Sequence, residues 1–164
     1  MRARPATPAD AAAMARVYNE GISDRVATFE TRCRTPEDVG RWFDGVHPIV
    51  VVEDGDGEVI AFAATSKYRD RECYAGIAET SLYVARESRG RGAGRMALSA
   101  LIESAAQAGY WKLVSRIFPE NQASRSLVSS LGFREVGVYE NHAKLDGAWR
   151  DVIIVERLIG SNVE

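Results

Sequence analysis

The sequence is poor in the residues that build metal centres and disulfide scaffolds. It contains two cysteines, Cys33 and Cys73, and two histidines, His47 and His142, in 164 residues. The cysteines lack the short spacing of zinc ligands and stand near no pair of histidines. We therefore expect no metal site, no disulfide framework, and free thiols in a reducing compartment. Neither histidine matches a catalytic pattern, and we expect both to be structural or surface residues.

Long apolar runs and an excess of one charge are missing as well. No uninterrupted apolar run approaches the ~20 residues of a membrane span, and no apolar segment follows the basic start of the chain. The 21 basic and 23 acidic residues are spread along the chain and leave a formal charge of −2. No global field therefore favours nucleic acid or an anionic membrane. We expect a soluble, cytoplasmic protein without either partner.

The apolar content that is present suits one core. With 46% hydrophobic residues in 164, we expect a single domain over residues 1–164, without repeats or a linker. Caps, turn residues and periodicity predict the order β, α, α, a β-meander, then α, β, α, β, β. This mixed α/β arrangement lacks the regular alternation of a doubly wound domain.

Two Thr-Pro pairs predict the first two helices, because threonine caps a helix and proline suits its first position. Thr7-Pro8 begins a helix to about residue 22, and Thr35-Pro36 begins one through Trp42 and Phe43 to near residue 45. Further helices are predicted from the glycine segment to residue 109 and over residues 121–131. Extended segments are predicted over residues 2–6, 49–53, 58–63, 75–84, 112–118, 133–140 and 152–158.

One segment carries the clearest chemical signal. Arg89-Gly90-Arg91-Gly92-Ala93-Gly94 lies between a predicted strand and a predicted helix. Glycines there leave backbone N–H groups uncovered, and the helix dipole adds positive charge, so the segment favours a pyrophosphate. Arg89, Arg91 and Arg95 add three cations. A solvated basic turn is the alternative interpretation of the same spacing.

The pattern is neither the dinucleotide fingerprint nor a Walker segment, since it lacks the third glycine of the first and the Gly-Lys-Ser/Thr of the second. It matches Arg/Gln-x-x-Gly-x-Gly/Ala as Arg89-x-x-Gly92-x-Gly94. Asn121-Gln122-Ala123-Ser124 and then Leu131-Gly132-Phe133 follow downstream. In these two motifs the chain resembles the GNAT superfamily of N-acetyltransferases. The resemblance implies the acyl-CoA N-acyltransferase fold, a mostly antiparallel central sheet with flanking helices, and acetyl-CoA as cosubstrate.

A closer resemblance spans nearly the whole chain. Thr28-Phe29-Glu30, Tyr68-Arg69, residues 79–84 and residues 144–151 are similar to the phosphinothricin and methionine sulfoximine acetyltransferase family. Residues 29–32, 71–76 and 112–116 are most similar to its arsinothricin N-acetyltransferase branch. These enzymes acetylate the α-amino group of glutamate-like antibiotics. The resemblance implies that activity, antibiotic resistance and a homodimer, in which residues 144–151 complete the neighbouring acceptor pocket.

The resemblance also implies a set of cofactor contacts. Backbone groups of Leu82, Tyr83 and Val84 would contact the pantetheine arm, and Gly90 through Arg95 would hold the phosphates. The expected cofactor-binding residues are Leu82, Tyr83, Val84, Arg89, Gly90, Arg91, Gly92, Ala93, Gly94, Arg95, Asn121 and Ser124. Asn121 could instead cap its helix, and the two roles do not exclude each other.

Glu79 is the expected catalytic base. An α-ammonium group has a pKa near ~8 and must lose a proton before it attacks a thioester. Glu79 lies in a strand of apolar and small residues just before the glycine segment, and the resemblance places the family's catalytic glutamate there. A solvated or ion-paired glutamate is the alternative. Backbone N–H groups near residues 82–84 would stabilise the developing oxyanion.

The proton donor for the leaving thiolate is not evident. Many superfamily members carry a tyrosine seven residues after the motif asparagine, where this chain has Val128. A water, Ser124 or Tyr139 would have to serve instead, and the thiolate is a tolerable leaving group.

The acceptor site is expected at the loop from residue 68 to 72. Arg69 would pair with the substrate carboxylate through its planar fork, with Arg71 and Asp70 beside it. By resemblance, Phe29 walls the pocket and Thr80 and Ser81 lie on the substrate strand with Glu79. An exposed charged loop and ordinary packing of Phe29 are the alternatives. Two other functions remain open: peptide or protein acetylation, and acetyl-CoA sensing without catalysis.

Overall fold

The structure is a computed structural model that describes residues 1–163. Its centre is a seven-stranded sheet in the order β1-β2-β3-β4-β5-β7-β6. The strands are β1 Arg2–Pro5, β2 Ile49–Glu53, β3 Val59–Lys67, β4 Ile77–Val84, β5 Lys112–Ile117, β6 Arg134–Leu145 and β7 Ala148–Leu158. The α-helices are α1 Ala11–Asp24, α2 Pro36–Gly40, α3 Ala93–Gln107 and α4 Gln122–Ser130. The predicted mixed α/β fold with a mostly antiparallel sheet is confirmed.

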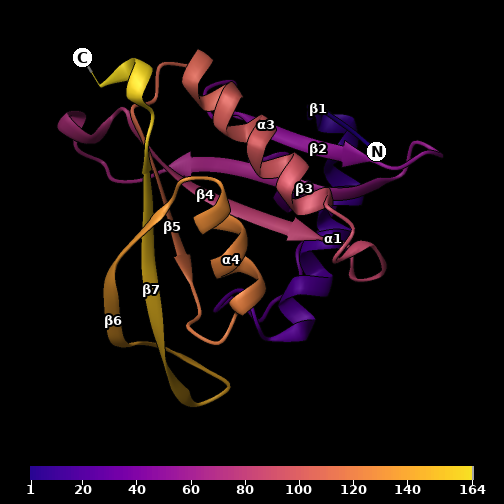
Figure 1. Cartoon of the computed structure of the whole chain (residues 1–164). Helices are drawn as coiled ribbons and strands as arrows, with labels where there is room; N and C mark the ends of the chain where they lie inside the picture. The colour runs from indigo at the N-terminus through magenta and orange to yellow at the C-terminus, as the bar shows by residue number, and fades with distance from the viewer. Residues whose placement is uncertain (164) are drawn as a thin grey trace.

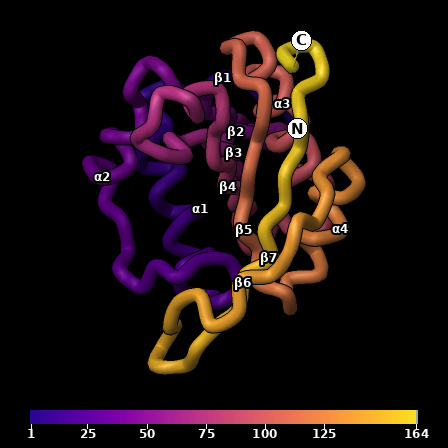
Figure 2. The backbone as a smooth tube through the Cα atoms, turned by 90° about the vertical axis from the view of Figure 1, so that its left-hand side faces the viewer, coloured from indigo at the N-terminus to yellow at the C-terminus, as the bar shows by residue number. Residues whose placement is uncertain are grey.

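Helices cover both faces of the sheet, with α1 and α2 on one side and α3 and α4 on the other (Figure 2). On the α3 face, buried Ala97, Leu98 and Leu101 pack against Val50 and Ile60 of the sheet. On the α1 face, buried Met14 and Val17 pack against Phe62. Each amphipathic helix therefore buries its apolar stripe against the same sheet, which fixes the positions of the helix ends.

The second helix is shorter than the sequence predicts. Its start is as expected, because Thr35 Oγ1 accepts the N–H of Asp38 at 3.1 Å. The helix nevertheless ends at Gly40 instead of continuing to residue 45. Trp42 packs against the α1 cluster, and Asp44 Oδ1 accepts the N–H groups of Val46 and His47, both at 2.8 Å. Tertiary packing and this carboxylate turn therefore replace the predicted last turn of helix.

The sheet opens between β4 and β5. These parallel strands pair only at Ile77–Lys112, Ala78–Leu113 and Glu79–Val114. Beyond Glu79, β4 stays with β3 and β5 stays with β7, and the two strands diverge in Figure 1, where α4 is drawn between their ends. The splay places strand backbone without a neighbouring strand beside the N-termini of α3 and α4.

The last two strands form a hairpin that is longer than predicted. Asp146 and Gly147 join β6 to β7 with φ of 49° and 82°, the left-handed pair that a tight two-residue hairpin turn requires. Asp146 Oδ2 accepts the Nε of Arg25 at 2.8 Å, so the hairpin tip is tied to the end of α1. Within residues 1–163, no helix is long and apolar enough to cross a membrane, and no group of three or more His, Cys, Asp or Glu could hold a metal ion.

Candidate active site

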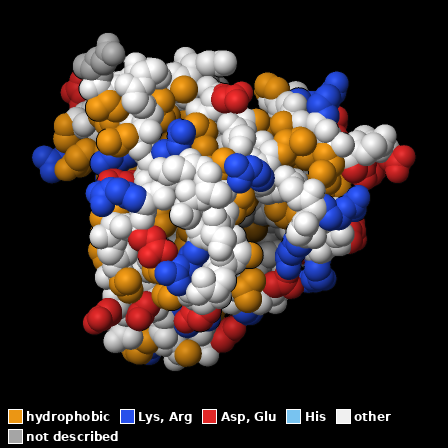
Figure 3. All heavy atoms as spheres, viewed as in Figure 1, with side chains coloured by type: hydrophobic (Ala, Val, Ile, Leu, Met, Phe, Trp, Pro, Cys, Tyr) orange, Lys and Arg blue, Asp and Glu red, His pale blue; other side chains and the backbone are white. Residues whose placement is uncertain are grey.

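A cavity of about 480 Å³ lies where the splay meets the N-termini of α3 and α4. The face seen in Figure 3 is hollowed near its centre, with hydrophobic atoms inside and basic side chains at the rim. The cavity is lined by residues of four segments: Gly21, Val26, Ala27, Leu82, Tyr83, Val84, Arg89, Gly90, Gly92, Gly94, Arg95, Asn121, Ala123, Ser124 and Leu127. Of the predicted cofactor residues, Arg91 and Ala93 are absent from this lining. Arg91 is exposed and Ala93 is buried beneath the loop.

The glycine loop has the geometry that an anion cradle needs. Gly92 caps α3 with φ of 90°, and Gly90 has φ of 73°, so L side chains would strain both positions. A Cβ on Gly94 would lie 3.3 Å from side-chain carbons of Val84 and Leu127. The backbone N–H groups at the start of α3 are therefore open toward the cavity, at the positive end of the helix dipole. The loop fits the pyrophosphate of acetyl-CoA.

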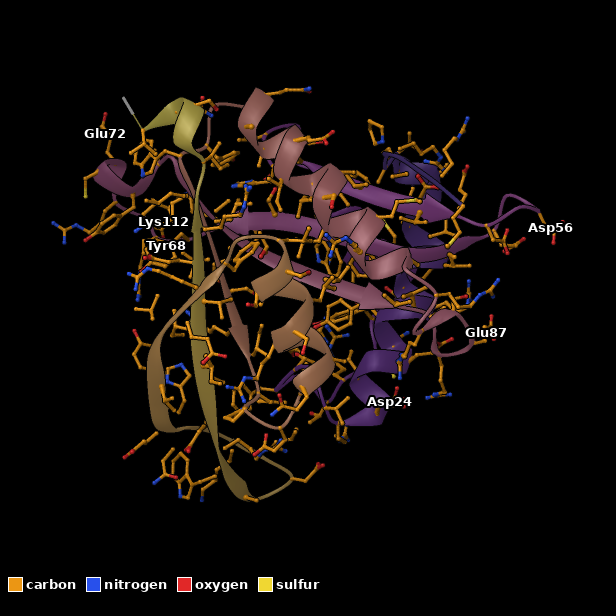
Figure 4. The ribbon with its side chains drawn as sticks, in the orientation of Figure 1. Asp24, Asp56, Tyr68, Glu72, Glu87 and Lys112 are labelled. Carbon is orange, nitrogen blue, oxygen red and sulfur yellow. The ribbon has the colours of Figure 1, made fainter. Side chains whose placement is uncertain are left out.

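The arginines of the loop are held in different ways. Arg89 forms an ion pair with Asp24 at 2.7 Å and donates its Nε to Val84 O at 3.2 Å. Arg95 donates to Ser130 Oγ at 2.8 Å. Arg86 first, then Arg89, lowers the pKa of Asp24, which remains ionised. Asp24 thus ties the end of α1 to the segment before the glycine loop, and Figure 4 shows Asp24 and Glu87 at the same end of the molecule.

The open edge of β4 faces the cavity. The carbonyl oxygen of Thr80 accepts a hydrogen bond from the Ser115 hydroxyl, and that of Val84 accepts one from Nε of Arg89. Both carbonyl groups therefore point away from β3. Because peptide groups alternate along a strand, Leu82 points the same way. The Tyr83 ring lies on the α1 face, stacked on Phe62 at 5.5 Å between ring centroids. Leu82 and Val84 therefore offer backbone groups to an extended chain, while Tyr83 contributes a side-chain wall.

Asn121 is the N-cap of α4. Its side-chain oxygen accepts the N–H of Ser124 at 3.1 Å, and its Nδ2 donates to Val26 O at 3.3 Å. The capping alternative is therefore realised, while the same residue lines the cofactor cavity. The second contact also joins α4 to the loop after α1.

Glu79 occupies the last paired position before the splay. Its Oε1 accepts the Nη2 of Arg116 from β5 at 3.0 Å, and its side chain is 30% exposed. The structure therefore shows Glu79 in an ion pair. This pair lies at the point where β4 and β5 begin to separate. Arg116 was not among the predicted site residues, because its pairing with Glu79 depends on β4 and β5 being adjacent.

A smaller cavity of about 80 Å³ fills the splay. Thr80 and Ser81 line it from β4, and Ser124 and Val128 line it from α4. Ser124 lines the cofactor cavity as well, so its hydroxyl lies at the junction of the two. Tyr139, the other predicted proton donor, is 50% exposed on β6 and packs at a tilt against His142, with 4.9 Å between ring centroids.

The predicted acceptor arginines line a third cavity, of about 290 Å³, together with Lys67 and Asp70. The Arg69 guanidinium lies over the Tyr68 ring at 5.2 Å, and that of Arg71 over the Tyr74 ring at 5.9 Å. Among residues 1–163, neither arginine has a carboxylate partner. Tyr68 first, with smaller contributions from the charges of Tyr139 and Glu79, raises the pKa of Arg69.

The other two predicted acceptor residues have different partners, although Asp70 lines the same cavity as the arginines. The Asp70 carboxylate is 91% exposed and pairs with Lys67 at 2.9 Å. Phe29 packs edge-on against Phe118 at 5.0 Å, in a small cluster with Leu145 under the β6–β7 hairpin. The structure therefore shows the packing alternative for Phe29 and a surface ion pair for Asp70.

A fourth cavity, of about 370 Å³, was not anticipated. It lies on the α1 face between β3, β4 and the loop after α2, and its lining includes Trp42, His47, Lys67 and Ser81. His47 and Lys67 line this cavity and the arginine cavity alike. Placing Trp42 in a continuing helix concealed this wall at the sequence level.

A glycine cradle at a helix N-terminus and an open strand edge beside it suit an acetyl-CoA-dependent N-acetyltransferase. The sequence matches the profile described as Acetyltransferase (GNAT) domain over residues 1–134. The chain belongs to the GNAT acetyltransferase family.

The chain is also similar to individual members of the family. The chain is 31% identical to a phosphinothricin N-acetyltransferase of Streptomyces coelicolor, over 96% of this chain and 95% of that protein. It is 32% identical to an L-methionine sulfoximine/L-methionine sulfone acetyltransferase of Pseudomonas paraeruginosa, over 93% of this chain and 91% of that protein. The crystal structure of a GNAT superfamily phosphinothricin acetyltransferase from Sinorhizobium meliloti in complex with acetyl-CoA superposes with a TM-score of 0.91 at 28% identity, covering 99% of this chain and 90% of that one.

Proposed function

We propose that this single-domain chain transfers an acetyl group from acetyl-CoA to the α-amino group of a glutamate-like amino acid, of which phosphinothricin, methionine sulfoximine and arsinothricin are the candidates. Acetylation of such an antibiotic would confer resistance. The observation that carries the proposal is the position of Glu79, at the root of a splay that opens toward the cofactor cavity. The names of the two relatives support this acceptor class.

Glu79 is the proposed base. Its carboxylate accepts a proton from the acceptor ammonium, directly or through a water, and this releases the amine lone pair. Arg116 holds one carboxylate oxygen at 3.0 Å and leaves the other oxygen without a protein partner in residues 1–163. The ion pair thereby orients the base without blocking both of its oxygens.

Acetyl-CoA supplies the thioester carbonyl that the amine attacks. The chain contributes the N–H groups of Leu82 and Val84 on the open edge of β4, fixed in direction before the reaction begins. Ser124 is the proposed hydrogen-bond donor to the leaving thiolate, because its hydroxyl lies where the cofactor cavity meets the splay. Tyr139 is less suited, because it lines none of the cavities described above. The second proton that the amine nitrogen loses as the amide forms passes to the thiolate or to water.

Arg69 and Arg71 are the proposed anchors of the acceptor. Neither is neutralised by a carboxylate within residues 1–163, and their guanidinium groups lie over tyrosine rings that leave the N–H edges free. Arg69 also experiences the charge of Glu79. A carboxylate bound by Arg69 would therefore bring the adjacent α-amino group toward the base.

The test is release of free thiol from acetyl-CoA with phosphinothricin, methionine sulfoximine, arsinothricin and a peptide panel. We expect turnover of the amino acids, and a fall in kcat of roughly 10²- to 10⁴-fold in Glu79→Gln with an unchanged KM for acetyl-CoA. Glu103→Gln, an exposed carboxylate change on α3, serves as the matched control. Acetylation of peptides alone, or tight cofactor binding without thiol release from any amine, would overturn the proposal.

We also propose that the protein acts as a homodimer in the cytoplasm. β6 pairs with β7 on one side only, and Val136, Val138, Tyr139 and Trp149 on the hairpin are 48–57% exposed. An apolar edge of this kind favours a partner. The exposed free cysteines Cys33 and Cys73 suit a reducing compartment.

Analytical ultracentrifugation tests the dimer. We expect two copies per particle, and dissociation in Val138→Lys. Val163→Lys, at an exposed apolar position outside the hairpin, is the control. A monomer at assay concentration with full activity would contradict the proposal.

A further inference from the structure

His47 and Asp44 form a dyad in the loop after α2. His47 Nδ1 lies 2.5 Å from Asp44 Oδ2, and Asp44 Oδ1 accepts the backbone N–H groups of Val46 and His47. The backbone N–H of His47 first, and then its imidazole, lowers the pKa of Asp44 to about 2. Asp44 is therefore a carboxylate throughout the neutral range, and it fixes which imidazole nitrogen faces outward.

The imidazole is also held by packing. Its ring stacks on Tyr110 with 6.1 Å between centroids, and the His47 side chain is 15% exposed. With Nδ1 bound to Asp44 and one face covered by Tyr110, Nε2 is the atom left to meet a ligand.

His47 lies between two of the cavities described above. It is part of the wall between the cavity of Arg69 and Arg71 and the cavity under Trp42. Lys67, the other residue common to both cavities, is already paired with Asp70. An acceptor held by Arg69 near Glu79 would extend its side chain along this shared wall.

The charge around the wall favours an anion. The charged lining of the two cavities consists of Arg41, Lys67, Arg69 and Arg71 against Asp44, Asp70 and Glu72. Asp44 is paired with His47 itself and Asp70 with Lys67, whereas Arg69 and Arg71 have no carboxylate partner in residues 1–163. A ring that donates Nδ1–H to Asp44 can bind a second acidic oxygen by donating Nε2–H as well, and a hydrogen bond from Nε2 to an anionic oxygen is charge-assisted.

We propose that His47, oriented by Asp44, binds the distal acidic group of the acceptor side chain and so selects amino acids with an anionic side chain. This inference rests on the proposed function. Asp44 acts through His47 and is a positioning residue. The ligand group is a phosphinate, carboxylate or arsinate oxygen at the far end of a glutamate-like amino acid.

Two acceptors with the same α-amino acid head test the inference. Phosphinothricin carries an anionic distal group, and methionine sulfone carries a neutral one. In His47→Gln we expect the KM for phosphinothricin to rise at least about 10-fold, as expected when one charge-assisted hydrogen bond is lost. The KM for methionine sulfone and both kcat values should change less than about 2-fold. Asp44→Asn should give a smaller rise for phosphinothricin only.

The controls separate this role from a structural one. His142→Gln makes the same chemical change on exposed β6 and should leave both KM values unchanged. Thermal unfolding of His47→Gln and His47→Asn establishes that each variant is folded, and ligand-induced stabilisation in the presence of coenzyme A gives binding without turnover. Equal KM increases for both acceptors, or none for phosphinothricin, would overturn the inference alone. Absence of turnover of both acceptors by the unaltered protein would overturn the proposed function as well.

Discussion

The cofactor cavity is built from the ends of strands and helices, whereas the two cavities that share His47 and Lys67 take most of their charged side chains from the end of β3 and from the loops after α2 and β3. In the first, backbone N–H groups of α3 and β4 are open toward the cavity, and Gly90, Gly92 and Gly94 keep them uncovered. In the other two cavities, charged side chains of the loops after α2 and β3 form part of the lining. Figure 4 shows the two ends, with Asp24 and Glu87 on one side and Tyr68 and Glu72 on the other.

The two ends of the molecule therefore offer two kinds of contact, backbone groups at one end and charged side chains at the other. Backbone groups at helix ends are positioned by the sheet and are the same for every sequence that can adopt the loop conformation. Side chains on loops can be exchanged without disturbing the sheet. In the proposed function, their charges decide which acceptor is bound. We therefore expect substitutions at the two ends to change different kinetic constants.

The largest effect in this comparison is expected at Gly92. A valine there must adopt φ near 90° at a cost of roughly 1–2 kcal/mol and covers the start of α3. We expect Gly92→Val to weaken coenzyme A binding by about 10- to 100-fold, measured by calorimetry. Gly57→Val imposes the same strain at φ of 86° in the β2–β3 turn. Equal binding losses in both variants would show that the loss comes from destabilisation, not from the cradle.

The corresponding change at the acceptor end is Arg69→Gln. Loss of a charge-assisted contact should raise the acceptor KM by about 10-fold and leave the KM for acetyl-CoA unchanged. Steady-state kinetics with phosphinothricin measure both constants. Arg2→Gln removes an exposed arginine from the far edge of the sheet and should change neither. A rise in the KM for acetyl-CoA in Arg69→Gln would show that the two ends do not act on separate kinetic constants.

Asn121 combines a cap with a place in the cofactor cavity. Asn121→Ala should lower the free energy of unfolding by about 1 kcal/mol, because Ser124 N–H loses its acceptor. Asn121→Ser should restore most of this stability, because serine caps as well. Denaturant titration measures the loss. If both variants are equally unstable, the contact with Val26 O, which neither retains, is the important one.

The smallest effect is expected for the stability contribution of Asp44. Its folded pKa of about 2 lies below the ordinary 3.8, so its contribution is present above about pH 4 and is lost as the pH falls toward 2. Because the side chain is 43% exposed, Asp44→Asn should cost less than about 1 kcal/mol at pH 7. Denaturant titration at pH 7 and pH 3 should show the difference shrinking. A difference that grows at pH 3 would have the wrong sign.

The cofactor end could be predicted from sequence because its signals are local. The cap at Asn121 and the glycines before α3 lie within a few residues of the backbone they shape. The predicted strands and helices around them are present, with small shifts at their ends. Only the side-chain positions differ, since Arg89 is paired with Asp24 at the end of α1.

The acceptor end could be predicted only in part, because its contacts join distant segments. Arg116 reaches Glu79 across 37 residues of sequence, and it does so at the point where two parallel strands separate. His47 gains its restraint from Tyr110, which follows α3. Neither contact leaves a pattern in the sequence. The error in the length of α2 hid Trp42 and the wall it forms for the same reason.

The early separation of β4 from β5 has a consequence for the dynamics of the free protein. The amides of Leu82 and Val84 lie inside a continuous strand, yet their hydrogens face the open edge instead of another strand. In deuterated solvent they would exchange like the amides of a loop, while the alternate amides bonded to β3 remain protected. Binding of coenzyme A would slow hydrogen exchange only at the amides of the open edge. The protected residues would then identify which amides donate hydrogen bonds to the bound pantetheine arm.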